Sequence, residues 1–148
     1  MRVVVQRSLD SYVLVNGKIT GSIDKGLVVL VGFTHDDDIN DIDYIVKKII
    51  NLRIFDDKDG VMNLSIKDIQ GEILIVSQFT LCGCVKKGTR PSFDNAMKPD
   101  EANEMYEYFI EKVKQQNIPV KTGVFGAHMD IQLLNDGPVT FVIEAPIF

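Results

Sequence analysis

The stretch Gly26-Leu27-Val28-Val29-Leu30-Val31-Gly32-Phe33 is apolar without interruption from Leu27 to Val31. Successive side chains of a strand point to opposite faces, so an unbroken apolar run predicts a strand covered on both faces. Glu72-Ile73-Leu74-Ile75-Val76-Ser77-Gln78-Phe79-Thr80-Leu81 predicts a second buried strand, whose last residues turn polar. Two such strands favour a sheet with other elements packed against it.

Turn and cap signals place the elements around the first strand. Asn16-Gly17 tolerates the two positive φ angles of a type I′ turn, so it predicts a hairpin between Tyr12–Val15 and Lys18–Ile23. Asp38 can cap a helix that has Asp41 at its third position. Apolar residues then recur at intervals of three and four, as one stripe of that helix requires. They are Ile39, Ile42, Ile45, Val46, Ile49 and Ile50.

A second helix is predicted from Asp100 to Gln116, opened by Pro99 and ended by Asn117-Ile118-Pro119. Its apolar face holds Ala102, Met105, Tyr106, Phe109 and Val113. Three further strands are predicted at Val120–Thr122, Ala127–Leu134 and Val139–Glu144, the last two separated by a turn at Asn135-Asp136-Gly137-Pro138. The fold class is therefore α/β, with β-sheets covered by two main helices.

Length and composition agree with one globular domain over residues 1–148. The chain has 45% hydrophobic and 25% charged residues, and no repeat or linker divides it. No apolar run reaches the ~20 residues of a membrane span, and charge follows the first three valines too early for a signal peptide. The sequence therefore predicts neither a membrane partner nor secretion.

Cysteine usage points to a reducing compartment. Cys82 and Cys84 are the two cysteines of the chain, and they lie too close together for a useful clamp, so a cytoplasmic location is expected. Combined with His35 and His128 they could supply four zinc ligands, but the spacing matches no known zinc pattern. We expect no metal and no other cofactor.

The charge balance limits nucleic-acid binding to a local contact. Sixteen basic against 21 acidic residues give a net charge of −5, which argues against a protein whose main task is to grip phosphates. Lys86-Lys87-Gly88-Thr89-Arg90 is a basic island without an acidic residue. It is either a solvated loop or the place where a polyanion is met.

Two segments could carry chemistry. Ser77-Gln78-Phe79-Thr80-Leu81 places hydroxyls and an amide at the end of a buried strand, where a sheet protein can face a ligand, or where loops can bond to a strand end. Asn135-Asp136-Gly137-Pro138-Val139-Thr140 is an ordinary turn, or a rigid one facing a pocket if its proline bond is cis. A triad of Ser77, His128 and Asp130 lacks the G-x-S-x-G elbow.

Together these two segments resemble the signature motifs of the D-aminoacyl-tRNA deacylases, the family first known for D-tyrosyl-tRNA. Val5-Gln6-Arg7, Gly88-Thr89-Arg90-Pro91-Ser92-Phe93 and Thr122-Gly123-Val124-Phe125-Gly126-Ala127-His128-Met129 extend the resemblance over essentially the whole chain. His128 departs from the family pattern, which has an acidic or other polar residue there, so no role is assigned to it. The paired cysteines are also peculiar to this chain.

The resemblance implies a homodimer with two active sites at the subunit interface. The substrate would be the aminoacylated 3′ end of a tRNA, and the products a free D-amino acid and reusable tRNA. Glycine, being achiral, would also be released. The Gly137-Pro138 bond, cis in this family, would reach into the partner's site and read the α-carbon with its carbonyls. Gln78, Phe79 and Thr80 would form the catalytic strand end.

The resemblance also assigns the supporting residues. The substrate pocket would be formed by Ser77, Leu81, Ala102, Phe125, Met129, Gly137 and Pro138. Arg7 would hold the Gly-Pro segment, and Lys86, Lys87 and Arg90 would meet tRNA phosphates. An aminoacyl ester is already activated, so its hydrolysis needs oxyanion donors and a positioned nucleophile. Thr80 could be that nucleophile, although no base flanks it, or the 2′-hydroxyl of the substrate could assist instead.

Two other functions remain open from the sequence. A noncatalytic dimer could keep the pocket and bind the acceptor end or a small adenylate. A sibling deacylase could remove another mischarged amino acid, although it would be expected to differ around Gly137-Pro138. Selective release of D-tyrosine over L-tyrosine from one charged tRNA separates these possibilities.

Overall fold

A computed structural model describes residues 1–145 and confirms the α/β class. Its α-helices are α1 (Ile39–Asn51) and α2 (Pro99–Lys114), and a short 3₁₀ turn, η1, spans Phe79–Cys82. Its strands are β1 (Arg2–Val15), β2 (Lys18–Gly32), β3 (Phe55–Asp56), β4 (Met62–Leu64), β5 (Glu72–Ser77), β6 (Val120–Thr122) and β7 (Asp130–Glu144). No helix among the described residues is long and apolar enough to cross a membrane.

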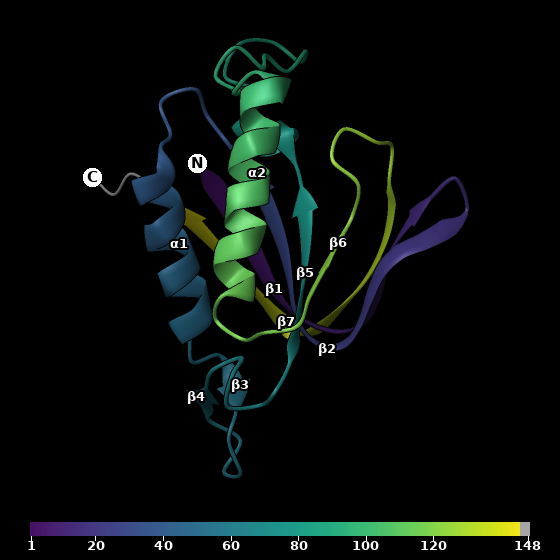
Figure 1. Cartoon of the computed structure of the whole chain (residues 1–148), viewed down its shortest axis with the longest axis vertical. Coiled ribbons are helices and arrows are strands. Elements are labelled where there is room, and N and C mark those ends of the chain that lie inside the picture. The colour runs from purple at the N-terminus through teal and green to yellow at the C-terminus, as the bar shows by residue number, and fades with distance from the viewer. Residues whose placement is uncertain (146–148) are drawn as a thin grey trace.

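The main sheet is mixed and has the order β6-β5-β2-β1-β7. β1 pairs antiparallel with β2 and β7, whereas β5 pairs parallel with β2 and β6. β3 and β4 form a separate small hairpin below α1 in Figure 1. The two strands predicted to be buried, β2 and β5, therefore lie at the centre of the sheet.

The predicted hairpin turn is confirmed. Asn16 and Gly17 have φ angles of 51° and 77°, and the strands on either side are paired. The hairpin and the buried strand that follows are one continuous element, because β2 runs from Lys18 to Gly32. Gly26 makes this possible at φ 153°, since a Cβ there would lie 1.8 Å from the Glu72 carbonyl oxygen of β5.

The two helices cover the same face of the sheet, as Figure 1 shows. α1 begins with the predicted capping box, in which Asp38 accepts from the Asn40 and Asp41 amides and Asp41 accepts from the Asp38 amide. The predicted apolar stripe is buried except at Ile39, which is 50% exposed. The prediction that Ile39 belongs to this stripe is wrong. Ile39 is the first residue of the helix, and its side chain does not pack against the sheet.

The opposite face is covered by the sheet itself. The hairpin end of β1 and β2 curls away from the helices in Figure 1, and its side chains close a second apolar cluster. The buried members of this cluster are Val13, Ile23, Val28, Leu74 and Val76. The double coverage expected for the buried strands thus comes from two helices on one side and a folded-over hairpin on the other.

Three predicted strand boundaries are wrong. The strand predicted to begin at Ala127 begins at Asp130. The strand predicted to reach Leu81 ends at Ser77, because its partner β2 stops one residue after the last pair, Val31 with Ser77, and the chain turns into η1. The turn predicted to separate two strands near the C-terminus lies inside β7. β1 remains paired on both sides of it, so the extra residues bulge from a continuous strand instead of ending it.

Candidate functional site

A pocket of about 690 Å³ opens where β5 ends. Its wall combines the end of β5, the η1 turn, the segment before α2, the start of α2 and the segment before β7. Of the residues predicted for the site, the pocket brings together Ser77, Gln78, Phe79, Thr80, Ala102, Phe125 and Met129.

The polar wall of the pocket is formed by the residues after β5. The Gln78 side-chain amide donates to the Thr80 hydroxyl over 2.5 Å. Phe79 is 61% exposed and packs edge-to-face on Phe93, with ring centroids 5.1 Å apart. A large aromatic ring left this open at a pocket mouth is a surface on which a flat ligand group can stack.

Two backbone N–H groups of this wall are free to donate. The amides of Phe79 and Thr80 begin the η1 turn, where no acceptor precedes them within the helix. Within residues 1–145 neither amide is paired, whereas the next amide, that of Leu81, donates to the Gln78 carbonyl. Adjacent N–H donors beside a pocket can stabilise negative charge that develops on an oxygen atom.

The floor of the pocket is apolar and rigid. Phe125 packs on Tyr106 of α2, with ring centroids 5.6 Å apart. The buried Tyr106 hydroxyl donates to the Ile75 carbonyl of β5 over 3.0 Å. Burial raises the pKa of Tyr106 well above its ordinary value, so the phenol is neutral and serves as a tie between α2 and β5.

Two groups of predicted residues do not line the pocket. Leu81 is not part of the pocket lining, and its backbone carbonyl accepts from the Arg2 guanidinium over 3.0 Å. The side chains of Lys86, Lys87 and Arg90 are exposed on the loop that connects Thr80 to Phe93. Because both ends of this loop belong to the pocket wall, the basic residues lie on a segment anchored at the site.

The Gly137-Pro138 segment also lies outside the pocket of its own chain. Its peptide bond is cis, and both residues are exposed. Arg7 on β1 holds the preceding residue, because its Nε donates to the Asp136 carbonyl over 2.9 Å. Arg7 is buried, with 8% of the residue exposed, and its guanidinium also donates to the Ile54 carbonyl over 2.9 Å.

Several pocket residues escaped the sequence analysis. Phe93, Lys98 and Pro99 line the pocket, and so does His128, which was assigned no role. Phe93 lies in a quoted motif, and Pro99 was identified as a helix start, so both carried a local signal. What the sequence could not show was that the start of α2 faces the end of β5. The His128 side chain is 92% exposed and lies 3.4 Å from Asp130.

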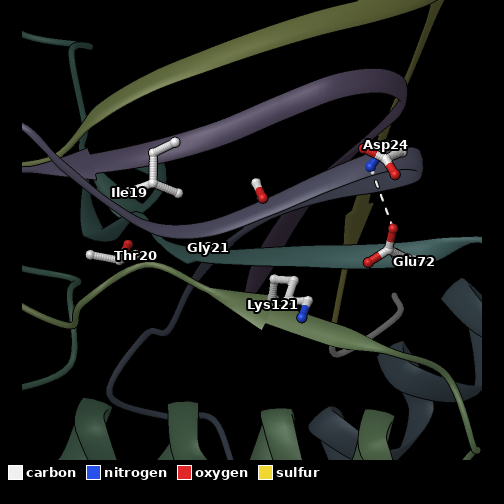
Figure 2. A pocket seen from close by; sticks show the side chains of 7 residues that line it. Ile19, Thr20, Gly21, Asp24, Glu72 and Lys121 are labelled. Carbon is white, nitrogen blue, oxygen red and sulfur yellow. Dashed lines mark hydrogen bonds between the residues drawn. The ribbon is translucent and has the colours of Figure 1, made fainter.

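A second hollow, of about 420 Å³, is lined by none of the predicted residues. Figure 2 shows it between the hairpin arm of β2 and the strands β5 and β6. The Asp24 amide reaches the Glu72 carboxylate there over 3.4 Å, and Lys121 lies alongside.

Fold and pocket together define the class of protein: a mixed-sheet α/β protein whose site offers an exposed aromatic ring, hydroxyls and free backbone N–H donors. The chain belongs to the family described as D-Tyr-tRNA(Tyr) deacylase, which matches residues 4–144. It is 56% identical over 145 residues to a D-aminoacyl-tRNA deacylase of Persephonella marina, covering 98% of each chain. A D-aminoacyl-tRNA deacylase of Clostridioides difficile is 53% identical, with 98% of this chain and 97% of the relative covered.

Solved structures share the fold. One described as c-Myc DNA Unwinding Element Binding Protein has a TM-score of 0.94 and 41% identity, covering 99% of this chain and all of that one. Another, described as a probable eukaryotic D-amino acid tRNA deacylase, has a TM-score of 0.81 and 21% identity, with 96% and 97% covered. The second likeness concerns the fold alone, whereas the family membership rests on the sequence matches.

Proposed function

We propose that this protein hydrolyses the ester bond of D-aminoacyl-tRNA and releases a free D-amino acid and tRNA, a proofreading step in translation. Family membership and the names of relatives that are more than half identical support this activity. The observation that locates this activity in the pocket at the end of β5 is the pair of free amides at Phe79 and Thr80 beside an apolar lining. Glycyl-tRNA, which has no configuration to reject, is a second substrate of the same site.

The reaction needs little from the protein beyond positioning and charge stabilisation. Water attacks the ester carbonyl and gives up a proton, the carbonyl oxygen becomes negative, and the amides of Phe79 and Thr80 donate to it. The carbon–oxygen bond to the ribose then breaks, and the ribose oxygen takes up a proton. Gln78, held by its bond to Thr80, orients the ester or the ribose.

Thr80 is a weak candidate for the nucleophile. Its hydroxyl accepts from the Gln78 amide, and no carboxylate or imidazole bonds to it within the described residues, so nothing removes its proton. We therefore favour assistance by the 2′-hydroxyl of the substrate. Thr80→Ala should then reduce single-turnover hydrolysis by less than about tenfold, whereas loss of a true nucleophile costs several powers of ten.

The site that we propose is shared by two copies of the chain. Ser77 to Thr80 line the pocket, but Gly137 and Pro138 do not line the pocket of the same chain and are exposed. In a homodimer they enter the partner's pocket, where their backbone carbonyls accept from the α-ammonium group of a D-residue. A backbone contact at the α-carbon rejects L-residues whatever their side chain, which a pocket shaped for one side chain cannot do.

The loop after η1 contacts the body of the tRNA. Lys86, Lys87 and Arg90 are exposed there, next to the pocket wall, and phosphate contacts of this kind position a nucleic acid without reading its sequence. We place the reaction in the cytoplasm, where charged tRNA is used and where Cys82 and Cys84 remain the free thiols seen here.

The decisive experiment compares the release of D-tyrosine and L-tyrosine from the same charged tRNA at micromolar enzyme. D-selective release is expected. Binding of the acceptor end without release of either amino acid would instead identify a noncatalytic binding protein. Selective release of an L-residue would identify a sibling editing enzyme.

A further inference from the structure

The Gly137-Pro138 segment is an excursion from a strand that stays paired on both sides. Gln6 of β1 pairs with Thr140, and Ser8 pairs with Asn135. A single residue of β1, Arg7, therefore faces four residues of β7, numbered 136–139. A bulge of this size has lost its ladder hydrogen bonds, so its conformation must be fixed by other groups.

The side chain of Asn135 supplies these bonds at the base of the bulge. Its Oδ1 accepts from the Val139 amide over 2.8 Å. Its Nδ2 donates to the Thr140 hydroxyl over 3.0 Å and to the Val139 carbonyl over 3.3 Å. One amide side chain thus joins the residue before the excursion to its last residue and to the residue after it, and uses both its acceptor and its donors.

We propose that Asn135 is a positioning residue, which clamps the 136–139 bulge in the single shape that the neighbouring active site requires. This role rests on the proposed function, because it assumes that Gly137 and Pro138 contact the substrate. The three bonds of Asn135 join the two ends of the bulge, so they set the direction in which the exposed residues Gly137 and Pro138 project.

Of the small side chains, asparagine suits the base of the bulge because it supplies both an acceptor for the Val139 amide and a donor for the Val139 carbonyl. Aspartate would keep the acceptor for the Val139 amide, but it has no donor for the Val139 carbonyl and would place a charge beside that oxygen. Alanine would leave the Val139 amide, which is part-buried, without its partner. The two variants therefore remove different parts of the same clamp.

The clamp is separate from the support given by Arg7. Arg7 binds the carbonyl of Asp136, the first residue of the bulge, and is anchored to the Ile54 carbonyl, whereas Asn135 binds Val139, the last residue of the bulge. The Thr140 hydroxyl also accepts from Gln6, so the Asn135 side of the bulge is tied to β1 as well. Loss of Asn135 should therefore loosen the bulge without unpairing β7.

The test compares Asn135→Ala and Asn135→Asp with the unaltered protein and with Asn51→Ala. Asn51 also donates to a backbone carbonyl, that of Lys47, but lies at the end of α1 far from the bulge in sequence and outside the pocket. Three quantities are measured: single-turnover hydrolysis of D-tyrosyl-tRNA, tRNA affinity, and hydrogen exchange of the Val139 amide.

We expect Asn135→Ala to slow the D-selective step by about 10- to 100-fold, the effect of displacing a contact by about an ångström, with tRNA affinity nearly unchanged. Exchange of the Val139 amide should speed up by at least about tenfold, because the open form of the bulge becomes more populated. Asn135→Asp should fall between Asn135→Ala and the unaltered protein in both measurements. Asn51→Ala should match the unaltered protein.

Unchanged exchange of the Val139 amide in Asn135→Ala would refute the clamp. Faster exchange with full D-selective turnover would refute the positioning role, since the bulge would then be loose and the site intact. Absence of D-selective turnover in the unaltered protein would overturn the proposed function and the positioning role with it, while the exchange measurement would still decide whether Asn135 clamps the bulge.

Discussion

The pocket wall after β5 and the bulge in β7 are held in opposite ways. The wall at Phe79 and Thr80 is open: its phenyl ring is 61% exposed, and both backbone amides are free within residues 1–145. The bulge at 136–139 is tied at each end, by Arg7 to its first residue and by Asn135 to its last. Under the proposed function, the region that receives varied substrates is open, whereas the region that distinguishes the two configurations at the α-carbon is fixed.

This difference suits a site that accepts varied side chains but one arrangement around the α-carbon. An open wall with free donors can bind any aminoacyl ester, because the ester and the terminal adenosine are common to all substrates. Under the proposed function, selection between D- and L-residues then depends on the fixed backbone of the bulge. Each of the following changes alters one side of this comparison and should leave the other side intact.

The largest effect is expected for Gly137→Ala. Gly137 has a φ of 151°, and a Cβ there would lie 2.6 Å from Val139 Cγ2 and 2.7 Å from the Val139 nitrogen, so the bulge must reshape. We expect D-tyrosyl-tRNA hydrolysis to fall at least about 100-fold. The free energy of unfolding should fall by about 1–3 kcal/mol.

The matched control is Gly60→Ala, which places a side chain at a positive φ of 74° in the loop between β3 and β4, with no atom within 4 Å. It should lose stability through the positive φ alone, by less than Gly137→Ala, and keep its hydrolysis rate. Equal loss of activity in both variants would mean that strain anywhere in the fold impairs the site, and the fixed bulge would not be special. Single-turnover assays and urea unfolding measure the two quantities.

A smaller effect is expected at the open side when Lys86, Lys87 and Arg90 are all replaced by serine. Binding of charged tRNA should weaken by about tenfold at moderate salt, and the salt slope should flatten by about one unit for each cation that meets a phosphate. A short aminoacyl-adenosine should be hydrolysed almost as before, because it does not reach this loop. Binding titrations at several salt concentrations test this.

Serine at Lys47, Lys58 and Lys67 makes the same change of charge at exposed positions elsewhere on the chain. This control should keep its tRNA affinity. If it weakened binding as much as the loop variant, the effect would come from net charge, and the loop would have no special contact. Equal loss on the short and long substrates would indicate a damaged pocket wall instead.

The smallest effect on hydrolysis is expected for a change at Tyr106, which packs on the pocket residue Phe125. Tyr106→Phe removes the bond to the Ile75 carbonyl and should cost about 1 kcal/mol of unfolding free energy while leaving hydrolysis nearly unchanged. Burial raises the pKa of Tyr106, so the folded state keeps its proton when the unfolded state loses one. The contribution of Tyr106 to the free energy of unfolding is therefore complete below about pH 10 and is lost above it, so the stability of the variant should decline less steeply.

Urea unfolding between pH 7 and pH 11 measures this difference. A parallel decline in the unaltered protein and in Tyr106→Phe would show that the phenol does not contribute to the pH dependence. A large loss of hydrolysis at neutral pH would instead give Tyr106 a part in the reaction.

The sequence predicted most reliably where local chemistry sets the structure. Asn16-Gly17 and the capping box of Asp38 and Asp41 depend on residues a few positions apart, and both are confirmed. Pro99 opens α2 as predicted. At these positions the energetic preference is local, so no knowledge of the rest of the fold is needed.

The sequence failed where a distant partner decides. Ser77 ends β5 because β2 ends beside it, and the turn residues at 135–138 remain within β7 because β1 stays paired on both sides. Ser77 to Thr80 were identified from their polar character, but Lys98 and His128 joined the pocket only through the packing of α2 and the segment before β7. The importance of the Gly137-Pro138 motif came from the family resemblance. From the residues alone it could be an ordinary turn, or a rigid turn facing a pocket if its proline bond is cis.

The most direct test of the central claim mixes two inactive variants of the chain. Ala102→Phe fills the pocket, which Ala102 lines from α2, and Gly137→Ala reshapes the bulge. Each variant is first shown to be folded by circular dichroism and inactive alone. If the wall and the bulge of one site come from different copies, random mixing restores about a quarter of the normal number of sites, because each mixed pair holds one unaltered site. Mixed particles without D-selective hydrolysis would contradict the account.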